Sequence, residues 1–216
     1  MEPVYSALAV QLQALPPQER VDLRKGWLSF NLDEYVGIGP TDRRSFAAFM
    51  TEWLLEPLGL DAAQVHLPDG FAPDPTAEAK RYGAAVTTAG GIGLQVLGLG
   101  QNGHVGFNEP PSAVDAPCRV VRLCDSTRRR NASSCSEGDE VPELAITLGL
   151  AEILAADRIL LVVSGSSKAE VLERTLRGPL TAELPASWLR LHPAVTVLAD
   201  SQALAGLGPR ETTKPR

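Results

Sequence analysis

The chain has 216 residues, a length that favours a single domain with a substantial core. Hydrophobic residues make up 44% and charged residues 21%, which excludes a mainly disordered chain. The net charge of −6 makes nucleic acid a poor partner, because a phosphate backbone needs a basic protein face. No apolar run is long enough to cross a bilayer, so we expect no membrane partner either.

The cysteines and the first residues bear on the cellular setting. The 3 cysteines have no zinc-like spacing, and no grouping of His, Cys and Asp suggests another metal site. The first residues lack the basic-then-apolar pattern of a signal peptide. We therefore expect a cytoplasmic protein without a metal ion or another cofactor.

Helical and strand-like segments alternate along the first half of the chain. Apolar residues recur at helical spacing over residues 4–15 and again over 46–54. Residues 27–32 read as a strand between these two helical segments. Asp74 precedes Pro75, and a carboxylate N-cap followed by proline predicts a helix from there to the next pair of glycines.

The second half is rich in strand candidates. The apolar run 92–99 is bounded by glycines, as in a strand that is buried on both faces. The run 158–164 is the strongest strand candidate, and an amphipathic helix follows it. Weaker strand candidates are 119–123, 144–148 and 195–198.

This alternation predicts the fold class. Strands that alternate with helices imply right-handed crossovers and a mainly parallel sheet. We therefore predict an α/β fold of three layers, with a Rossmann-like sheet and helices on both of its faces. A single domain is expected over residues 1–207, followed by a flexible polar tail over 208–216.

Ligands of such folds bind beyond the carboxyl ends of the strands, so polar residues at those ends are candidate site residues. The first such group is residues 31–37, where Asp33 and Glu34 follow the first predicted strand. Two adjacent acids at a strand end can supply a general base. The alternative is that the acid pair only caps a turn before Gly37.

A second polar group, residues 98–110, follows the buried strand that glycines bound. Its glycines, Gly103 among them, let the backbone approach a ligand. His104 lies between Asn102 and Glu109, and a carboxylate partner makes an imidazole a proton carrier near neutral pH. The alternative is a glycine-rich turn that holds a hydrogen-bonded histidine.

A third group, residues 165–168, follows the strongest strand. Small residues such as Ser166 expose backbone N–H groups at a helix N-terminus, where the helix dipole favours an anion. Lys168 adds a full positive charge, which suits a phosphate better than a carboxylate. The alternative is a helix cap beside a solvated lysine.

Other basic residues have weaker claims. His66 lies in a weak strand and His192 precedes a proline, and we expect both to be structural. Residues Arg128 to Arg130 form a short basic run, which reads as a solvated face from which one arginine could reach a phosphate.

Taken together, these segments resemble the glucosamine-6-phosphate deaminase/isomerase family. The most specific are NLDEYVG and LGLGQNGHVGFNEP. The related 6-phosphogluconolactonases share the fold and a Gly-His turn, but the Asn-Glu-Pro that follows the turn here favours the amino-sugar branch. The matching segments are 31–37, 97–110, 126–132, 165–169 and 191–193.

The resemblance implies an enzyme that converts glucosamine 6-phosphate or galactosamine 6-phosphate to a ketose 6-phosphate and ammonia. Asp33 matches the family's base, which moves a proton between carbons 1 and 2 of the open-chain sugar. His104 matches the proton donor to the ring oxygen, with Glu109 as its carboxylate partner. Lys168 matches a ligand of the 6-phosphate. The implied partner is a small sugar phosphate, and a homo-oligomer stays open because family members range from monomers to larger assemblies.

Two residues depart from the family pattern. Asn102 stands where the deaminases usually have an aspartate; an amide can orient the imidazole but cannot stabilise its cation as a carboxylate would. Relatives that act on galactosamine 6-phosphate resemble this chain there, so the sugar epimer stays open. Ser133 stands where many relatives have an arginine that binds the phosphate, and Arg129 or Arg130 is a candidate replacement.

The start of the chain also departs from the family, which begins with a strand, a helix, a second strand and a Gly-Thr-rich phosphate loop. The present chain resembles the family from the helix after that loop. We therefore expect the first β-α-β part to be missing and Met1 to be an internal or mis-assigned start. The missing strand would leave an unpaired edge beside the strand 27–32 or the strand 92–99.

Two other functions are weighed against the deaminase. A sugar-phosphate-binding module without turnover is suggested by Asn102, by Ser133 and by the missing loop, whereas the presence of Asp33, His104 and Glu109 argues against it. A 6-phosphogluconolactonase is the other alternative, and it would not need the Asp33 base.

Overall fold

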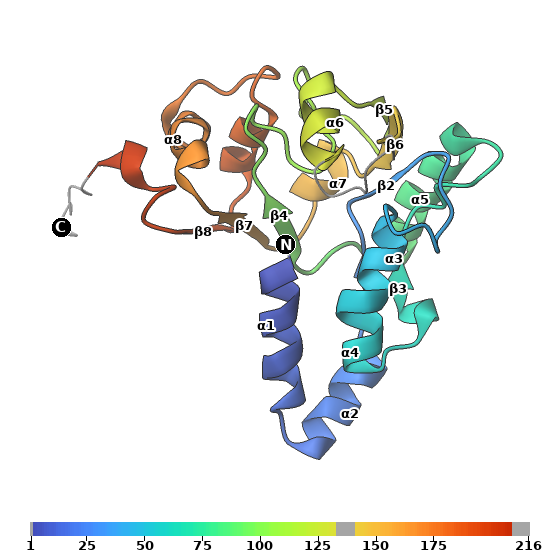
Figure 1. Ribbon diagram of the computed structural model, residues 1–216. Helices are drawn as coiled ribbons and strands as arrows, with labels where there is room; N and C mark the ends of the chain where they lie inside the picture. The colour runs from blue at the N-terminus through green and yellow to red at the C-terminus, as the bar shows by residue number, and fades with distance from the viewer. Residues whose placement is uncertain (1, 133–140, 209–216) are drawn as a thin grey trace. The chain divides into compact units, whose positions relative to one another are not determined.

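The computed structural model describes residues 2–132 and 141–208 (Figure 1). The chain groups into two compact units by its internal contacts. None of the described helices is long and apolar enough to cross a membrane. The predicted single domain stays a prediction, and residues 209–216 of the predicted tail lie outside the described residues. Unit 1 comprises Met1–Gly90 and Cys118–Leu148, and unit 2 comprises Gly91–Pro117 and Gly149–Arg216.

Unit 1 begins with two helices joined by a short turn. The apolar stripe predicted over residues 4–15 forms α1 (Glu2–Gln13), and α2 (Pro17–Gly26) follows it (Figure 1). Pro17 stands at the first helical position of α2, where its missing N–H costs no hydrogen bond.

The second predicted stripe forms one continuous helical segment. It consists of α3 (Phe46–Met50), a π-helical turn (Thr51–Leu55) and α4 (Glu56–Leu58). Gly59 ends this segment with a φ of 60°, a left-handed conformation that favours glycine. The predicted end near Pro57 is therefore confirmed to within two residues.

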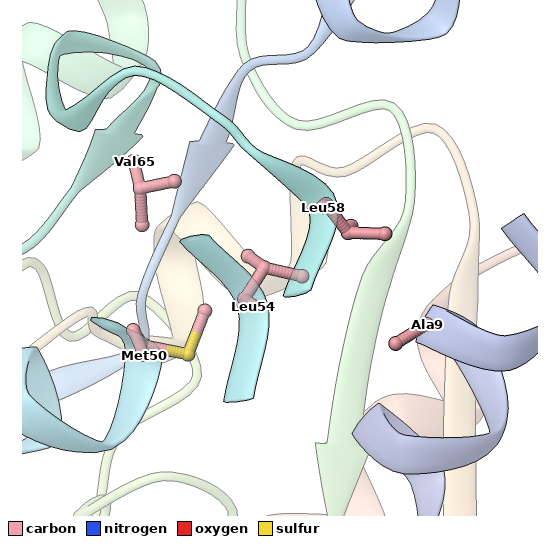
Figure 2. Close-up of a cluster of buried hydrophobic side chains, with 5 residues drawn as sticks. All are labelled: Ala9, Met50, Leu54, Leu58 and Val65. Carbon is pink, nitrogen blue, oxygen red and sulfur yellow. The ribbon is translucent and has the colours of Figure 1, made fainter. Parts of the chain in front are cut away.

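The core of unit 1 joins α1 to this helical segment. Ala9 of α1 packs with Met50, Leu54 and Leu58, and Val65 closes the cluster (Figure 2). Each of these side chains is less than a tenth exposed. The helical spacing of the three apolar residues in the second segment places them on one face, which is why that face is buried.

Helix α5 (Pro75–Thr88) confirms the predicted cap. The Asp74 side chain accepts hydrogen bonds from the backbone N–H groups of Thr76, at 2.9 Å, and Ala77, at 3.0 Å. Both donors would otherwise lack a partner in the first helical turn. Unit 1 also contains α6 (Asp125–Ala132) and a 3-10 turn (Ala62–Gln64).

The first predicted strand divides into two. β1 (Ser29–Phe30) pairs in parallel with β3 (Val65–His66). The Asn31 N–H still donates to the carbonyl of His66, at 2.9 Å, but the carbonyl of Leu32 accepts from Leu148, at 2.7 Å. The chain therefore changes its pairing partner between Asn31 and Leu32, and a run that looks continuous in the sequence forms two strands.

β2 (Asp33–Tyr35) begins directly after this change of partner. It pairs antiparallel with β6 (Leu144–Thr147), which pairs antiparallel with β5 (Arg119–Arg122). These strands lie at the predicted places in the sequence. Their antiparallel sheet differs from the expected mainly parallel arrangement, because residues 144–148 meet both neighbours in the opposite direction.

Unit 2 contains a parallel sheet, as predicted. β4 (Gln95–Gly98), β7 (Ile159–Val163) and β8 (Val195–Ala199) follow one another in the order β4-β7-β8 (Figure 1). Gln95 and Leu97 of β4 are buried, whereas Val96 and Gly98 on the other face are only partly buried, so the predicted burial on both faces is wrong for this strand. β4 is shorter than the predicted run 92–99, because the pairing with β7 begins only at Gln95.

Two α-helices and three 3-10 turns complete unit 2. The predicted amphipathic helix after β7 is α8, and it opens with a 3-10 turn. The elements are α7 (Leu150–Leu154), α8 (Ala169–Arg177) and the turns Ser166–Lys168, Pro185–Leu191 and Ala205–Leu207.

Both strands predicted to border a gap lie at sheet edges. Within the described residues, β1 pairs only with β3, and β4 pairs only with β7. That a first β-α-β part is missing stays a prediction.

Candidate functional site

Asp33 and Glu34 stand side by side in β2 but have different surroundings. Glu34 is only 2% exposed. Its carboxylate accepts hydrogen bonds from the Ser45 hydroxyl, at 2.6 Å, and from the Ala47 N–H, at 2.9 Å. Both donors lie at the N-terminus of α3, so Glu34 caps that helix. The capping alternative therefore describes Glu34, which leaves Asp33 as the candidate base.

Asp33 is half-buried and lies opposite Thr147 of β6. Two effects raise the pKa of Asp33 to about 8: burial, which is the larger effect, and the negative charge of Glu34. Both disfavour the ionised form of the Asp33 carboxyl group. Burial is also the main reason that the pKa values of Tyr5 and Tyr82 are raised, and the charge of Asp33 adds to both. A carboxyl group with such a pKa can take up and return a proton near neutral pH.

The segment after β4 forms a tight glycine-rich turn. The Gly100 N–H donates to the carbonyl of His104, at 2.9 Å, and the Gly103 N–H donates to the carbonyl of Gly100, at 3.1 Å. The imidazole lies directly against Gly100, where an added Cβ would be 2.4 Å from the His104 Nε2. The turn therefore fixes the ring at the carboxyl end of β4.

Asn102, His104 and Glu109 meet within this loop. The Asn102 Nδ2 donates to the Glu109 Oε2 at 2.5 Å, and the same oxygen lies 3.4 Å from the His104 Nδ1. The His104 and Glu109 side chains are 18% and 11% exposed. The buried Nδ1 of His104 makes no hydrogen bond. The structure thus brings the imidazole and the carboxylate together, but the amide of Asn102 binds the carboxylate rather than the ring.

A second segment of unit 2 fastens this loop at both ends. At one end the carbonyl of Gly103 accepts from the Ala186 N–H, at 2.8 Å, and Leu184 packs so closely that a Cβ on Gly103 would lie 2.2 Å from its Cδ1. At the other end the Trp188 indole donates to the carbonyl of Ser112, at 3.1 Å. Gly103 is therefore required by packing as well as by its φ of 85°.

The third predicted group follows β7 and also reaches the end of β4. Ser166 is exposed and Lys168 is half-buried. The Lys168 Nζ donates to the carbonyl of Leu99, at 2.6 Å, and Leu99 directly precedes the glycine under the imidazole. The structure therefore places an ammonium group and an imidazole at the same strand end.

Asp200 is a neighbour of this group that the sequence analysis missed. Its carboxylate accepts from the backbone N–H of Ala203, at 2.7 Å, and from that of Gly165, at 2.9 Å. These hydrogen bonds lower the pKa of Asp200. A carboxylate therefore already occupies one N–H of the turn in which a phosphate was expected.

The other two histidines have structural surroundings, as expected. His66 stacks on Phe30 with ring centroids 4.7 Å apart. His192 accepts from the Ala194 N–H at its Nδ1, at 3.1 Å, and its Nε2 lies 2.7 Å from the carbonyl of Ala156.

The basic run has one member with described side-chain contacts. Arg128 donates to the carbonyl of Val141 through its Nη2, at 3.3 Å, and it lies 4.0 Å from a carboxylate oxygen of Glu143. Ser133 lies outside the described residues, and Arg129 is exposed on α6. A role of an arginine in phosphate binding stays a prediction.

Tyr5, Tyr82 and Trp188 also escaped the sequence analysis. Tyr5 belongs to an apolar helical stripe, and Tyr82 donates to the carbonyls of Asn31 and His66 at the end of the β1–β3 pair. No local pattern distinguishes a tyrosine of this kind from an ordinary core residue. Only the pairing of the strands shows that the tyrosine supports the segment before Asp33.

Six of the seven predicted site residues belong to unit 2, and Asp33 belongs to unit 1. The convergence of Asp33 with His104 and Lys168 therefore stays a prediction. Among the described residues, no group of three or more His, Cys, Asp or Glu side chains could hold a metal ion.

The parallel sheet of unit 2, with polar loops at the carboxyl ends of β4 and β7, defines an α/β protein of the Rossmann-like type. The chain belongs to the family of glucosamine-6-phosphate isomerases and 6-phosphogluconolactonases, whose model matches residues 2–198. The predicted family is therefore confirmed.

Curated relatives are similar over most of the chain. A protein of Cutibacterium acnes is 42% identical over 203 residues, which cover 94% of this chain and 76% of the relative. A protein of Oceanobacillus iheyensis is 45% identical over 176 residues, which cover 82% of this chain and 70% of the relative. Both relatives are named glucosamine-6-phosphate deaminase.

Solved structures confirm the α/β fold. A monomeric glucosamine-6-phosphate deaminase superposes with a TM-score of 0.86 at 35% identity, over 95% of this chain and 83% of the other. A 6-phosphogluconolactonase from Trypanosoma cruzi superposes with a TM-score of 0.73 at 18% identity, over 96% of this chain and 81% of the other. At that identity the likeness to the lactonase shows a shared fold alone.

Proposed function

We propose that the chain is a glucosamine-6-phosphate deaminase, which converts an amino-sugar 6-phosphate and water to a ketose 6-phosphate and ammonia. The observation that carries the proposal is the group of Asn102, His104 and Glu109 beside the ammonium of Lys168 at the end of β4. The identity of 41–45% to proteins named as deaminases supports the same reaction.

Opening of the sugar ring is the first step assigned to this site. The imidazole of His104 has one nitrogen toward the Glu109 carboxylate and the other against Gly100 at the strand end. A protonated ring can give its proton to the ring oxygen of the sugar and then recover one, with the negative charge of Glu109 favouring the cation in between.

The proton shift between carbons 1 and 2 is assigned to Asp33. The carboxylate takes the proton from carbon 2 of the open-chain sugar and returns it to carbon 1. The carbon–nitrogen bond at carbon 2 becomes an imine, which water hydrolyses to the ketone and ammonia. The raised pKa of Asp33, about 8, supports this assignment, because a base that must also return its proton works best near neutral pH.

The phosphate is assigned to Lys168 and the turn that begins at Ser166. The Lys168 Nζ donates to the carbonyl of Leu99, and its positive charge at the strand end favours an anion. The exposed Ser166 and the backbone N–H groups at the start of α8 add donors for an anion. Gly103 contributes through the turn that positions His104.

Release of ammonia tests the proposal directly. The full chain is incubated with glucosamine 6-phosphate and, separately, with galactosamine 6-phosphate, and ammonia and ketose phosphate are measured together. Ammonia and ketose phosphate are expected in equal amounts. The amino sugar that gives the faster release of both products identifies the preferred epimer. A folded protein that yields neither product from either sugar contradicts the proposal. Calorimetric binding of the sugar phosphate without product would instead identify a binding module.

A lactonase is the second candidate, because family members of that class share the fold. Ester hydrolysis needs no proton shift between two carbons and therefore no base at Asp33. Hydrolysis of 6-phosphogluconolactone that persists in Asp33→Asn would favour the lactonase. We expect instead that the wild-type chain prefers the amino sugar and that Asp33→Asn loses that activity.

The location and the assembly belong to the same proposal. A reaction on a phosphorylated sugar, together with cysteines that suggest no disulfide framework, supports the cytoplasm. The solved deaminase with the TM-score of 0.86 is described as monomeric. Light scattering on the full chain distinguishes a monomer from the homo-oligomer that stays open.

A further inference from the structure

Asn102 and His104 compete for one oxygen atom. The Oε2 of Glu109 accepts a hydrogen bond from the Asn102 amide at 2.5 Å, and it lies 3.4 Å from the His104 Nδ1. A hydrogen bond from an imidazolium to a carboxylate is normally about 2.7–2.9 Å long. The Nδ1 is buried and makes no hydrogen bond, so the amide holds the oxygen that the ring faces.

The amide weakens the effect of Glu109 on the ring in two ways. Its N–H dipole compensates part of the negative charge that the carboxylate presents to the Nδ1. It also holds the carboxylate at a distance that the ring cannot close to a short, charge-assisted bond. Both effects reduce the preference of Glu109 for a protonated ring over a neutral one.

We propose that Asn102 is a positioning residue that limits how strongly Glu109 favours the protonated imidazole of His104. The inference rests on the proposed function for its catalytic meaning. A ring that must give its proton to a sugar oxygen transfers it more readily when the carboxylate behind it does not hold that proton too firmly. Asn102 thereby makes His104 a stronger acid than Glu109 alone would allow.

Other groups around the loop do not change with Asn102. Lys168 binds the carbonyl of Leu99, next to the glycine under the ring. The segment that fastens the loop contributes the uncharged side chains of Leu184 and Trp188.

Titration of the His104 ring by NMR tests the proposal without any need for turnover. The chain has 3 histidines, so the His104 signal is the one that disappears in His104→Asn. In Asn102→Leu the donor is lost at similar size, and the midpoint of the titration is expected to move to higher pH by up to about one unit. In Asn102→Asp a second acid replaces the donor, and a rise of about one unit or more is expected.

A second background shows whether Asn102 acts through Glu109. Glu109→Gln removes the carboxylate whose charge the Asn102 amide compensates. In that background, the further change Asn102→Leu is therefore expected to leave the midpoint of the His104 titration unchanged. An unchanged or lower midpoint in both Asn102 variants of the wild-type chain overturns the proposal. An equal shift in the Glu109→Gln background overturns it as well. Because the ring titrates whether or not the sugar reacts, a chain without deaminase activity would contradict the proposed function and leave this result standing.

Discussion

The neighbouring carboxyl groups of Asp33 and Glu34 in β2 have different roles. Burial raises the pKa of Glu34, and four hydrogen bonds, two of them from the first turn of α3, oppose this effect by favouring the charged carboxylate. Burial, and to a smaller extent the negative charge of Glu34, raises the pKa of Asp33 and so favours a proton on it. Glu34, which caps a helix, therefore also helps to raise the pKa of Asp33, the proposed base.

Turnover is expected to depend on the charge of Asp33. Because the base must be ionised in the free protein, kcat/KM for deamination should rise with pH around a midpoint near 8, the raised pKa of Asp33. Asp33→Asn removes the base and should lower kcat by about 10²–10⁴-fold. The matched change Asp22→Asn, at an exposed position of α2, should leave the rate unchanged. Full activity of Asp33→Asn would rule out this assignment.

Stability is expected to fall with pH because of the same residue. The folded chain favours protonated Asp33 up to about pH 8, whereas the unfolded chain ionises it near its ordinary value of 3.8. Between these two pH values the folded state binds more protons, so the contribution of Asp33 to stability is lost as the pH rises. Thermal denaturation from pH 4 to pH 9 checks this: Asp33→Asn should show a smaller loss of stability than the wild-type chain. Parallel curves for the two proteins would contradict the raised pKa.

Single residues were predicted well where the chemistry is local. The glycines around His104, and the acid five residues after it, suffice to suggest an imidazole held beside a carboxylate. The hydrogen bond from Asn102 to Glu109 could not be predicted, because it joins residues seven positions apart across a turn whose path depends on Gly103. The role of Glu34 depends on Ser45 and Ala47, which only the fold brings to it.

At the scale of secondary-structure elements, helix caps and glycine turns determine where helices begin and where loops change direction. Helix α5 begins where a carboxylate meets its first N–H groups, and the loop after β4 turns where glycine permits a positive φ. Both signals lie within a few residues of the feature that they control. The division of residues 27–32 into β1 and β2 depends on β3 and β6, far along the chain, and so escaped prediction.

The cap of α5 gives a prediction for stability. Asp74→Ala leaves the N–H groups of Thr76 and Ala77 without their acceptor and should lower the free energy of unfolding by about 1 kcal/mol. Asp74→Asn keeps an acceptor oxygen and should cost less. Urea denaturation of the three proteins measures the difference. Equal stability of Asp74→Ala and the wild-type chain would show that the cap contributes nothing.

The turn before His104 gives a prediction for activity. Gly103→Ala combines a φ of 85° with a Cβ that would lie 2.2 Å from Leu184, so the loop must shift. Gly91→Ala is a matched control, with a φ of 88° and open space around the Cβ. Both changes should cost about 1–2 kcal/mol of stability for the backbone conformation. Only Gly103→Ala should also lower kcat, by about 10²-fold, because a displaced imidazole no longer meets its substrate. Equal kcat values for the two variants would contradict the role of the turn.

At the scale of the whole molecule, each unit is built from separate stretches of the chain. The chain passes from one unit to the other after residues 90, 117 and 148. Two strands of unit 1, β5 and β6, therefore follow the His104 loop of unit 2 in the sequence. The sheet strands of unit 1 come from sequence segments before and after a segment of unit 2. We therefore expect the two units to unfold together.

Core substitutions in each unit test this cooperativity. Leu54→Ala in unit 1 and Leu161→Ala in unit 2 remove side chains that are 2% and 1% exposed, and each should cost about 2–5 kcal/mol. Both should lower one common unfolding midpoint in urea, seen alike by circular dichroism and by the fluorescence of Trp188 in unit 2, with Trp27 and Trp53 replaced by Phe. Two transitions, each sensitive to one substitution only, would show that the units unfold separately.

The contact between Gly100 and the imidazole of His104 has a consequence for comparing genomes. Any side chain at position 100 would occupy the volume that the ring fills, so the two positions cannot vary independently. A homologous gene that encodes histidine at 104 but a larger residue at 100 encodes a displaced ring, however well the surrounding motif is preserved. This pair of positions therefore offers a simple marker for sorting newly sequenced homologues into those that keep the geometry of the strand end and those that have lost it.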